Sequence, residues 1–434
     1  MYKSSFENIT VALVGDVMLS KRLPVSPPSG LIQVHDILHA YECRIGNLET
    51  TVHYKDEGFP EAFPGGSYAV AEPASLNDLK WLGLNMFGTA NNHSMDYGHD
   101  GLLATIKYLR KADLPFAGTG KDLADAARPT YYDCKNGRVA LIGITSSFHD
   151  SYLAGPQNQD LRGRPGVNPL RHTETYELDE DDYNSLSNIV EKTGVGNYHA
   201  QAVKEGYIVQ QSKLKIGYYQ FQKGSTGIVH TAPHEGDLQR TLDGVRNAAC
   251  FADLVIVSIH SHQFKDNDKT KTPQFVTTFA HECIDTIGGG VVFCHGPHQL
   301  RGIEVYNNGI IFYGLGNFIL QHDQMNVLPE EQYVKYKTNR AKCFGEGELY
   351  DIQTKGNTRG LNTVKETQRS IIAGIEYSSS HFRVKLYPVQ LDRYGVCNST
   401  NDVSILEDVA KMSAEYGTNI KIDEQNAVAL IDVV

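Results

Sequence analysis

Five short polar segments constrain the fold of this chain most, because each directly follows an apolar run that predicts a strand. They are Gly15-Asp16, Asn47-Leu48-Glu49, Asn91-Asn92-His93, His260-Ser261-His262 and His295-Gly296-Pro297-His298. Predicted helices alternate with these strands, and this order favours a layered α/β fold. In such folds, ligands gather at the carboxyl ends of the strands. We therefore predict that the five segments meet at one edge of a sheet.

The predicted elements divide the chain into a main domain with two additions. Strands are predicted at 9–14, 43–46, 85–89, 138–145, 253–259 and 290–294, and helices at 31–40, 73–82, 101–112 (capped by Asp100), 236–252 and 273–287. The Asn307-Asn308-Gly309 turn predicts a hairpin that ends the main domain, residues 1–320. The pattern lapses at about 146–230, which indicates an inserted lobe with weaker helices at 179–193 and 199–211.

The C-terminal addition, 321–434, is expected to pack on the main domain. Its first part, 321–369, is polar and irregular in sequence. A second predicted hairpin joins 371–377 to 382–389, and a last helix is expected at 403–416.

Charge and composition exclude several classes of protein. The 434 residues carry a formal net charge of −11, which argues against a nucleic-acid-binding protein. No secretory signal and no stretch of 18 apolar residues are found, so neither export nor a membrane span is expected. The seven cysteines are odd in number and form no Cys-x-x-Cys pair. They predict reduced thiols in a cytoplasmic protein, with a homo-oligomer left open.

The side chains of the five segments are typical ligands of a divalent metal centre. Asp16 and Glu49 offer carboxylates, and Asn92 offers a neutral amide oxygen. Three imidazoles complete the predicted ligand set: His260, His295 and His298. Thiolates are absent from the set, which favours one or two catalytic ions, Mn²⁺ or Zn²⁺, over a closed structural zinc site. The 295–298 spacing is not helical, because Gly296-Pro297 breaks a helix.

Other residues near these segments suit proton transfer or substrate contact. His93 is the candidate general acid, and Asp96 three residues later can fix its tautomer. Asn47 and His262 are candidate substrate contacts, although His262 also suits a metal ligand. In the 161–171 loop of this acidic protein, Arg164 or Arg171 is expected to bind an anionic substrate group.

These motifs resemble the signature blocks of the CapA family, which is named for poly-γ-glutamate capsule synthesis and related to the calcineurin-like metallophosphoesterases. The resembling blocks are Gly15-Asp16-Val17-Met18, Asn47-Leu48-Glu49, Ala90-Asn91-Asn92-His93 with Asp96-Tyr97-Gly98, His295-Gly296-Pro297-His298, Gly302-Ile303-Glu304-Val305-Tyr306 and Ile311-Phe312-Tyr313-Gly314-Leu315-Gly316-Asn317-Phe318. The resemblance covers roughly residues 9–320.

The resemblance implies a four-layer α/β/β/α sandwich with a dinuclear-type site, the six predicted metal ligands and a catalytic His93. Two positions depart from the superfamily pattern. Met18 stands where metallophosphoesterases have the histidine of Asp-x-His, so one metal subsite is expected to lack a ligand. Glu49 matches the usual bridging aspartate, and its longer side chain changes the expected metal spacing. The chain also departs from the family in its expected location, because capsule-synthesis members are commonly exported and membrane-anchored.

Three functions are compatible with these residues. The leading one is a metal-dependent hydrolase, in which an activated hydroxide attacks a phosphoester or a γ-glutamyl or peptide-like amide and His93 protonates the leaving group. The second is a metal-dependent peptide epimerase or isomerase, in which His93 or His295 moves a proton at Cα. The third is a metal-binding component of polymer synthesis without catalytic activity. The expected substrate is anionic in the leading case.

Overall fold

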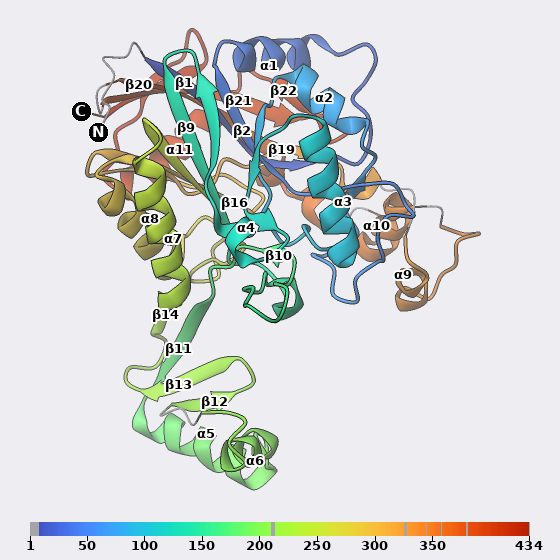
Figure 1. Ribbon diagram of the computed structural model, residues 1–434, viewed down its shortest axis with the longest axis vertical. Coiled ribbons are helices and arrows are strands. Elements are labelled where there is room, and N and C mark those ends of the chain that lie inside the picture. Colours follow the sequence, from blue (N-terminus) through green and yellow to red (C-terminus); the bar gives the residue numbers. More distant parts are fainter. Residues whose placement is uncertain are drawn as a thin grey trace.

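The structure is a computed structural model that describes residues 8–209, 213–324, 328–343, 345–356, 358–378 and 381–433. It has a mixed α/β architecture, as predicted, with two large sheets at its centre and a smaller sheet in a projecting lobe (Figure 1).

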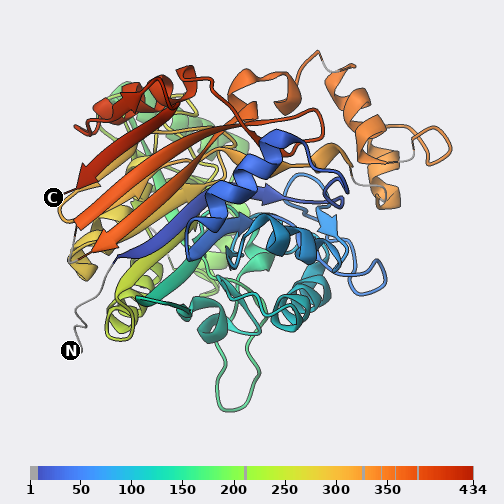
Figure 2. The ribbon, with the colours of Figure 1, turned by 90° about the horizontal axis from the view of Figure 1, so that it is seen from above.

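The larger sheet is built around the buried strand β1 (Ile9–Met18). Its strands run in the order β23-β24-β21-β20-β1-β2-β5-β6, with β19 paired to β1 and β22 to β21. Their bounds are β2 Cys43–Leu48, β5 Met86–Gly88, β6 Phe116–Ala117, β19 Asn317–Leu320, β20 Arg369–Ser378, β21 His381–Leu391, β22 Cys397–Ser399, β23 Lys421–Asp423 and β24 Val428–Val433. The C-terminal strands thus extend the sheet that the N-terminal strand begins (Figure 2).

Strand β1 changes partners along its length. Its first half, Ile9–Leu13, pairs antiparallel with β20, whereas Asp16–Met18 pairs parallel with β19. The change falls between Leu13 and Asp16, where the pairing of β1 with β2 has a register irregularity. A second irregularity, in the pairing with β19, lies between Asp16 and Val17. Asp16 therefore lies at the carboxyl end of the strand, beside Asn47 of the parallel strand β2.

The second large sheet has six strands in the order β17-β18-β16-β15-β9-β8. Their bounds are β8 Thr130–Cys134, β9 Gly137–Thr145, β15 Leu254–His260, β16 Gly290–His295, β17 Ile303–Tyr306 and β18 Gly309–Phe312. Strands β9, β15 and β16 are parallel, and Thr145, His260 and His295 align across them in register. These three residues end their strands, so the edge of this sheet also carries polar side chains.

Three clusters of buried side chains hold the main body together. One joins apolar residues of both sheets, including Leu13 and Phe293, so the sheets pack against each other. A second packs the larger sheet against helices α1 (Ser29–His39), α2 (Ser75–Leu82) and part of α3 (Gly98–Lys111). The third packs the six-stranded sheet against α7 (Glu235–Ala249) and α8 (Gln274–Ile287), and α11 (Ser404–Ala414) joins the first cluster.

The predicted strands and helices of the main domain are present within a few residues, with one local error. We predicted Asp100 as the cap of α3, but the helix begins at Gly98 and Tyr97 is its cap residue. Gly98 has φ 64°, a conformation that turns the chain into the helix earlier than a non-glycine residue allows. Asp100 instead lies in the first turn.

The projecting lobe consists of a four-stranded sheet in the order β12-β13-β11-β14 with two helices (Figure 1). Its elements are β11 His172–Leu178, α5 Glu180–Thr193, α6 Asn197–Lys204, β12 Leu214–Ile216, β13 Tyr219–Lys223 and β14 Val229–Pro233. Residues before it pack on the main body instead: β10 (Gly166–Val167) pairs with β7 (Thr119–Gly120), and Leu170 N–H donates to Thr145 O.

The segment that looked irregular in sequence contains short helices. They are η2 His322–Gln324, α9 Glu330–Lys335, α10 Glu346–Thr354, η3 Leu361–Thr363 and η4 Lys365–Gln368. The shorter elements of the main body are β3 Thr51–Val52, β4 Val70–Ala71, α4 Leu123–Ala127 and η1 Asp150–Tyr152. Across the described ranges, no helix combines the length and apolar character that crossing a bilayer requires.

Candidate metal centre

The polar ends of the two sheets meet, and they bring together two groups of metal-ligand side chains. The first group, the Asp16 triad, is Asp16, His260 and His295; the second, the Glu49 triad, is Glu49, His262 and His298. In each triad, one ligand-type atom per residue lies within 4.8 Å of the others. The carboxylates come from the larger sheet, and the imidazoles come from the six-stranded sheet and the loops that follow it.

The Asp16 triad is fully buried. Asp16 Oδ1 lies 3.7 Å from His295 Nδ1 and 3.9 Å from His260 Nδ1, and the two imidazole nitrogens are 2.9 Å apart. Burial lowers the pKa of His260 well below its usual value and that of His295 to about 4. Both rings are therefore neutral at pH 7, the form in which imidazole binds a metal.

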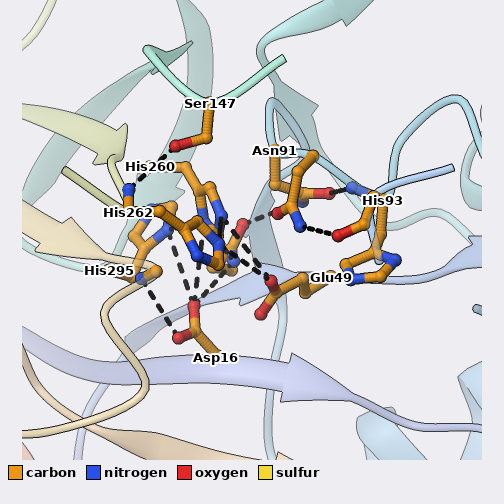
Figure 3. Close-up of polar contacts among 12 residues, drawn as sticks. Asp16, Glu49, Asn91, His93, Ser147, His260, His262 and His295 are labelled. Carbon is orange, nitrogen blue, oxygen red and sulfur yellow. Dashed lines mark hydrogen bonds and ion pairs between the residues drawn. The ribbon is translucent and has the colours of Figure 1, made fainter. Parts of the chain in front are cut away.

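The Glu49 triad adjoins the first and opens further toward solvent. His262 Nε2 lies 3.9 Å from Glu49 Oε1 and 3.0 Å from His260 Nε2. Figure 3 shows His260, His262 and His295 converging on the Asp16 and Glu49 carboxylates. His260 Nε2 is also 3.6 Å from Glu49 Oε1, and His298 Nδ1 is 3.6 Å from Asp16 Oδ2. The two triads thus form one continuous centre.

Glu49 tests whether these residues suit a cation. Its carboxylate is fully buried, and neither oxygen has a hydrogen-bond partner. Burial, followed by the charge of Asp16, raises its pKa well above the usual value. An unpartnered buried carboxylate is costly, and a divalent cation among neutral imidazoles relieves that cost. The donor set therefore fits a divalent metal ion.

Two neighbours orient the imidazoles. Ser258 Oγ lies 2.7 Å from His295 Nε2, so the Nδ1 atom of that ring faces Asp16. Asn317 Oδ1 lies 2.8 Å from His298 Nδ1, and an amide oxygen only accepts, so Nδ1 of His298 donates and Nε2 is free as a ligand. Such second partners fix the tautomer and orientation of a metal-binding histidine.

Backbone geometry explains two glycines of the signature segments. A Cβ at Gly15 would lie 1.9 Å from Gly316 O, where Asp16 N–H donates to that same carbonyl. Gly296 has φ 109°, and its N–H donates to Asp16 Oδ2 at 3.1 Å. His298 also has a positive φ of 58°, which is unusual for a non-glycine residue. The backbone at His298 is therefore locally strained, and this conformation directs its side chain toward the centre.

Asn47, predicted as a substrate contact, has a side chain that is completely buried between site residues. Its Nδ2 donates to Asp16 Oδ1 at 2.9 Å and lies 3.2 Å from His260 Nδ1, and its Oδ1 accepts from Asn91 Nδ2 at 3.0 Å. These hydrogen bonds orient the Asp16 triad, and a substrate contact by Asn47 stays a prediction.

Asn92 and His93 lie on the loop after β5. Asn92 Nδ2 donates to Gly65 O at 2.7 Å, while its buried Oδ1 has no partner, as a metal ligand requires. His93 Nδ1 lies 2.6 Å from Asp96 Oδ2, and His93 N–H donates to Asn91 Oδ1. Figure 3 places His93 beside Glu49, at the edge of the Glu49 triad.

Several hydrogen bonds hold the Asp96 carboxylate in place, which suits its predicted role of orienting His93. It is fully buried, and its carboxylate also accepts the backbone N–H groups of Gly65 and Ala69 at 2.8 and 2.7 Å. Burial raises the pKa of Asp96, and His93 opposes the rise. A buried carboxylate in this position orients the His93 ring and leaves its Nε2 facing away.

The two predicted anion-binding arginines differ in their contacts. Arg171 forms a two-pronged ion pair with Asp237, with Nε–Oδ2 and Nη2–Oδ1 distances of 2.8 and 2.9 Å. This ion pair joins Arg171, at the base of the lobe, to α7, and a substrate role for Arg171 stays a prediction. Arg164 is exposed and its Nε donates to Leu153 O. A substrate role for Arg164 stays a prediction.

Sequence reasoning missed two cations and one histidine near the centre. Lys269 is exposed, and its charge lowers the pKa values of His262 and His298 after the larger effect of burial. Arg301 is completely buried, and its Nε donates to Lys269 O while Nη2 donates to Gln263 O. The third residue, His322, follows β19. None of these three residues follows one of the predicted parallel strands. A position directly after such a strand was the signal that identified the other site residues.

Comparison with known proteins identifies a family whose matched region contains this centre. Residues 10–322 match the family described as bacterial capsule synthesis protein PGA_cap, and this span contains both triads. The chain belongs to this capsule synthesis family. The CapA resemblance of roughly 9–320 is thereby confirmed.

Relatives of this PGA_cap member cover it to different extents. An uncharacterised protein y4sH of Sinorhizobium fredii is 28% identical over 96% of this chain and 92% of its own length. The PGA biosynthesis protein CapA of Bacillus subtilis is 25% identical over 72% of this chain and 63% of its own length. The capsule biosynthesis protein CapA of Bacillus anthracis is 24% identical over 72% and 60% respectively.

Proposed function

We propose that this family member is a metal-dependent hydrolase whose ions are held by the Asp16 and Glu49 triads. The observation that carries the proposal is the buried Glu49 carboxylate, which has no hydrogen-bond partner and faces imidazoles that burial keeps neutral. Asn92 supplies a further unpartnered oxygen. We propose Mn²⁺ or Zn²⁺ as the metal, because the donor set mixes oxygen and imidazole nitrogen without thiolates.

Each side chain has a distinct role in this proposal. Bound divalent ions would polarise the scissile group and lower the pKa of a water molecule to near neutrality. In the proposed reaction the oxygen of this water would add to the phosphorus or carbonyl carbon, its proton would pass to solvent, and the bond to the leaving group would break. His93 donates a proton to the departing oxygen or nitrogen. Asp96 accepts from His93 Nδ1 and so keeps Nε2 directed at the leaving group.

The substrate class is proposed from the relatives and from the charges at the centre. Relatives are named for capsule or PGA biosynthesis, which points to a γ-glutamyl amide; the metallophosphoesterase relationship keeps a phosphoester as the other choice. Both substrates are anionic. Lys269 is exposed and lies near enough to His262 and His298 for its charge to act on them, so it suits the substrate's negative group.

Two further proposals concern architecture and location. The three buried clusters favour a four-layer α/β/β/α arrangement, in which helices cover the outer face of each sheet. Cys43, Cys283, Cys294 and Cys397 are buried free thiols, and this suits a reducing compartment such as the cytoplasm.

A direct test combines metal analysis with turnover. The purified protein, freed of metal and then supplied with Mn²⁺ or Zn²⁺, is expected to retain one or two ions per chain by elemental analysis. It is then incubated with a phosphodiester probe and with a γ-glutamyl oligomer. Hydrolysis of either substrate that His93→Ala abolishes without loss of metal supports the proposal. A wild-type protein that retains no metal contradicts it.

A second candidate function is favoured by the names of two relatives. A Mycobacterium tuberculosis protein, 24% identical over 63% of this chain, is named a probable polyglutamine synthesis accessory protein. An accessory role without catalysis predicts metal retention and no turnover, with function in polymer synthesis unchanged by His93→Ala. Deuterium uptake at Cα without hydrolysis would instead indicate the epimerase that the sequence also allows.

A further inference from the structure

His322 lies at the same sheet edge as the metal centre, although it belongs to the C-terminal addition. Strand β19 pairs in parallel with the end of β1, where Asn317 aligns with Asp16 and Leu320 with Met18. His322 follows two residues after Leu320 and opens η2. One strand thus carries Asn317, which orients His298, and leads directly to His322.

The chain around His322 is fixed by Gln321. Gln321 N–H donates to Met18 O at 2.9 Å, and its side-chain Oε1 accepts the backbone N–H groups of Ser20 and Lys21 at 3.0 and 2.9 Å. The His322 ring packs edge-on against Tyr350 of α10, with ring centroids 4.9 Å apart at 79°. Its position therefore follows from the strand pairing and from the packing of α10.

Both ring nitrogens of His322 are buried without a hydrogen-bond partner. The residue is only 8% exposed. A buried imidazole with neither nitrogen satisfied is costly, because each nitrogen is a donor or acceptor in either tautomer. Nearly all such groups in folded proteins find a partner, so two unpaired atoms on one ring point to a partner supplied from outside the chain.

The unpartnered atoms gather around the metal centre. Nine buried side-chain atoms in the described residues have no partner, and five belong to Glu49, Asn92 and His322. The charges of His298 and His93 act on His322, which places it within electrostatic reach of the Glu49 triad and the general acid. His322 belongs to neither triad. It therefore lies outside this ligand set, next to the strand end that carries Asp16.

We propose that His322 is a substrate-binding residue, which donates a ring N–H to an anionic oxygen of the substrate held at the two triads. The oxygen belongs to a phosphoryl or a carboxylate group, since both accept from imidazole. The inference rests on the proposed function for the position of the substrate. It also gives the helices η2 and α10 a role, because η2 carries this imidazole and Tyr350 of α10 packs against its ring.

The test measures anion binding to metal-loaded protein by calorimetry, with inorganic phosphate in one arm and γ-glutamyl-glutamate in the other. His322→Leu removes both nitrogens, and His322→Asn keeps an N–H donor. We expect His322→Leu to weaken binding of one anion by about 10- to 100-fold, with part of the affinity recovered in His322→Asn. The anion that responds identifies the phosphoryl or the carboxylate source.

His53→Leu is the matched control. His53 is also buried and has an unpartnered Nε2, but its ring packs against Tyr97 and no charge of the triads contributes to its pKa. Metal content is measured for every variant, so loss of metal is separated from loss of anion binding. Equal anion affinity in wild type and His322→Leu, or no anion binding by the wild type, overturns the inference. Weakened binding without turnover by the wild type leaves His322 in place and removes the hydrolase proposal.

Discussion

Glu49 carries a buried carboxylate whose two oxygens have no hydrogen-bond partner. Burial raises its pKa in the folded protein above the value of 4.5 expected when unfolded. Folding is therefore favoured by this group below about pH 4.5, and that contribution is lost as the pH rises through the folded pKa. A bound cation reverses the effect by favouring the charged form.

The raised pKa of Glu49 predicts that the metal-free protein loses stability as the pH rises. With metal removed, the wild type is expected to lose more stability between pH 5 and pH 8 than Glu49→Gln does, as measured by urea unfolding at the two values. The loss is expected to shrink when Mn²⁺ is restored to the wild type but not when it is restored to the variant. Glu366→Gln, at an exposed carboxylate, is the control. Identical pH dependence in wild type and Glu49→Gln would show that Glu49 is not the cause.

Met18 occupies the position where the superfamily pattern has a histidine, and the fold turns it away from the centre. It is 3% exposed and belongs to the cluster that packs against the outer helices. The register irregularity after Asp16 accompanies this change of direction. The side chain at this position therefore packs in an apolar cluster instead of offering a metal ligand.

Restoring the histidine is therefore expected to fail. Met18→His places a polar ring in an apolar cluster and is expected to destabilise the protein by about 1–3 kcal/mol. Met18→Leu, the control, should cost less than about 1.5 kcal/mol. The metal content of Met18→His is expected to equal that of the wild type. A gain of one ion per chain in Met18→His would contradict this placement of the side chain.

The sequence predicted individual site residues where a local pattern carried them. Asp16, His260 and His295 could be placed together because each ends a recognisable buried strand of a parallel sheet. Arg171 and His322 could not be interpreted in this way. The partner of Arg171 is Asp237, 66 positions away, and the surroundings of His322 are formed by a strand pairing that no local pattern indicates.

At the scale of elements, Asp237 in the first turn of α7 connects the helix to the base of the lobe. Its carboxylate accepts from Arg171, the residue before β11, and from Arg240 Nη1 at 2.7 Å. Arg240 also donates to Pro169 O and Asn168 Oδ1. One carboxylate thus fixes a helix and two neighbouring chain segments.

The ion pairs of Asp237 set a pH dependence of opposite sign to that of Glu49. Burial by itself raises the pKa of Asp237, but the hydrogen bonds from Arg171 and Arg240 lower it to about 2. The stabilisation is present above pH 3.8 and is lost as the pH falls toward 2. Because Arg171 is partly exposed, we expect Asp237→Asn to cost about 1–2 kcal/mol at pH 7.

Urea unfolding of Asp237→Asn at pH 7 and at pH 2.5 checks this prediction. The difference from the wild type should shrink at the lower pH. Asp243→Asn, on the exposed face of the same helix with a single pair to Arg246, serves as the control and should change little. An equal cost for the two variants at pH 7 would remove the special role of Asp237.

Elements were predictable in proportion to their length and periodicity. The long amphipathic helices α3, α7 and α8 and the buried strands β1, β9, β15 and β16 are close to their predicted bounds. Strands β19 and β24 were missed, because their few residues are ordered by pairing with β1 and β21 and not by a pattern of their own. The lobe strands were missed for the same reason, since they are only partly buried.

At the scale of the whole molecule, the metal centre depends on the meeting of the two large sheets. The larger sheet supplies both carboxylates and the six-stranded sheet supplies the imidazoles, so a bound ion would link the sheets at their polar edges. The lobe projects from the main body on β11 and β14 (Figure 1), and no residue of β11–β14 belongs to either triad. Its removal should therefore leave the centre intact.

Replacing residues 175–230 by Asn-Gly tests this division of the molecule. Glu174 and Thr231 are register partners in an antiparallel pair, so a two-residue turn can join them. Thr231 Oγ1, which accepts from Phe275 N–H, and the His172 ring stacked on Phe275 are both retained. We expect unchanged metal content and unchanged turnover of a small phosphodiester or γ-glutamyl dipeptide. A selective loss of turnover on long γ-glutamyl polymer would assign polymer binding to the lobe, whereas loss of metal would show that the lobe supports the centre.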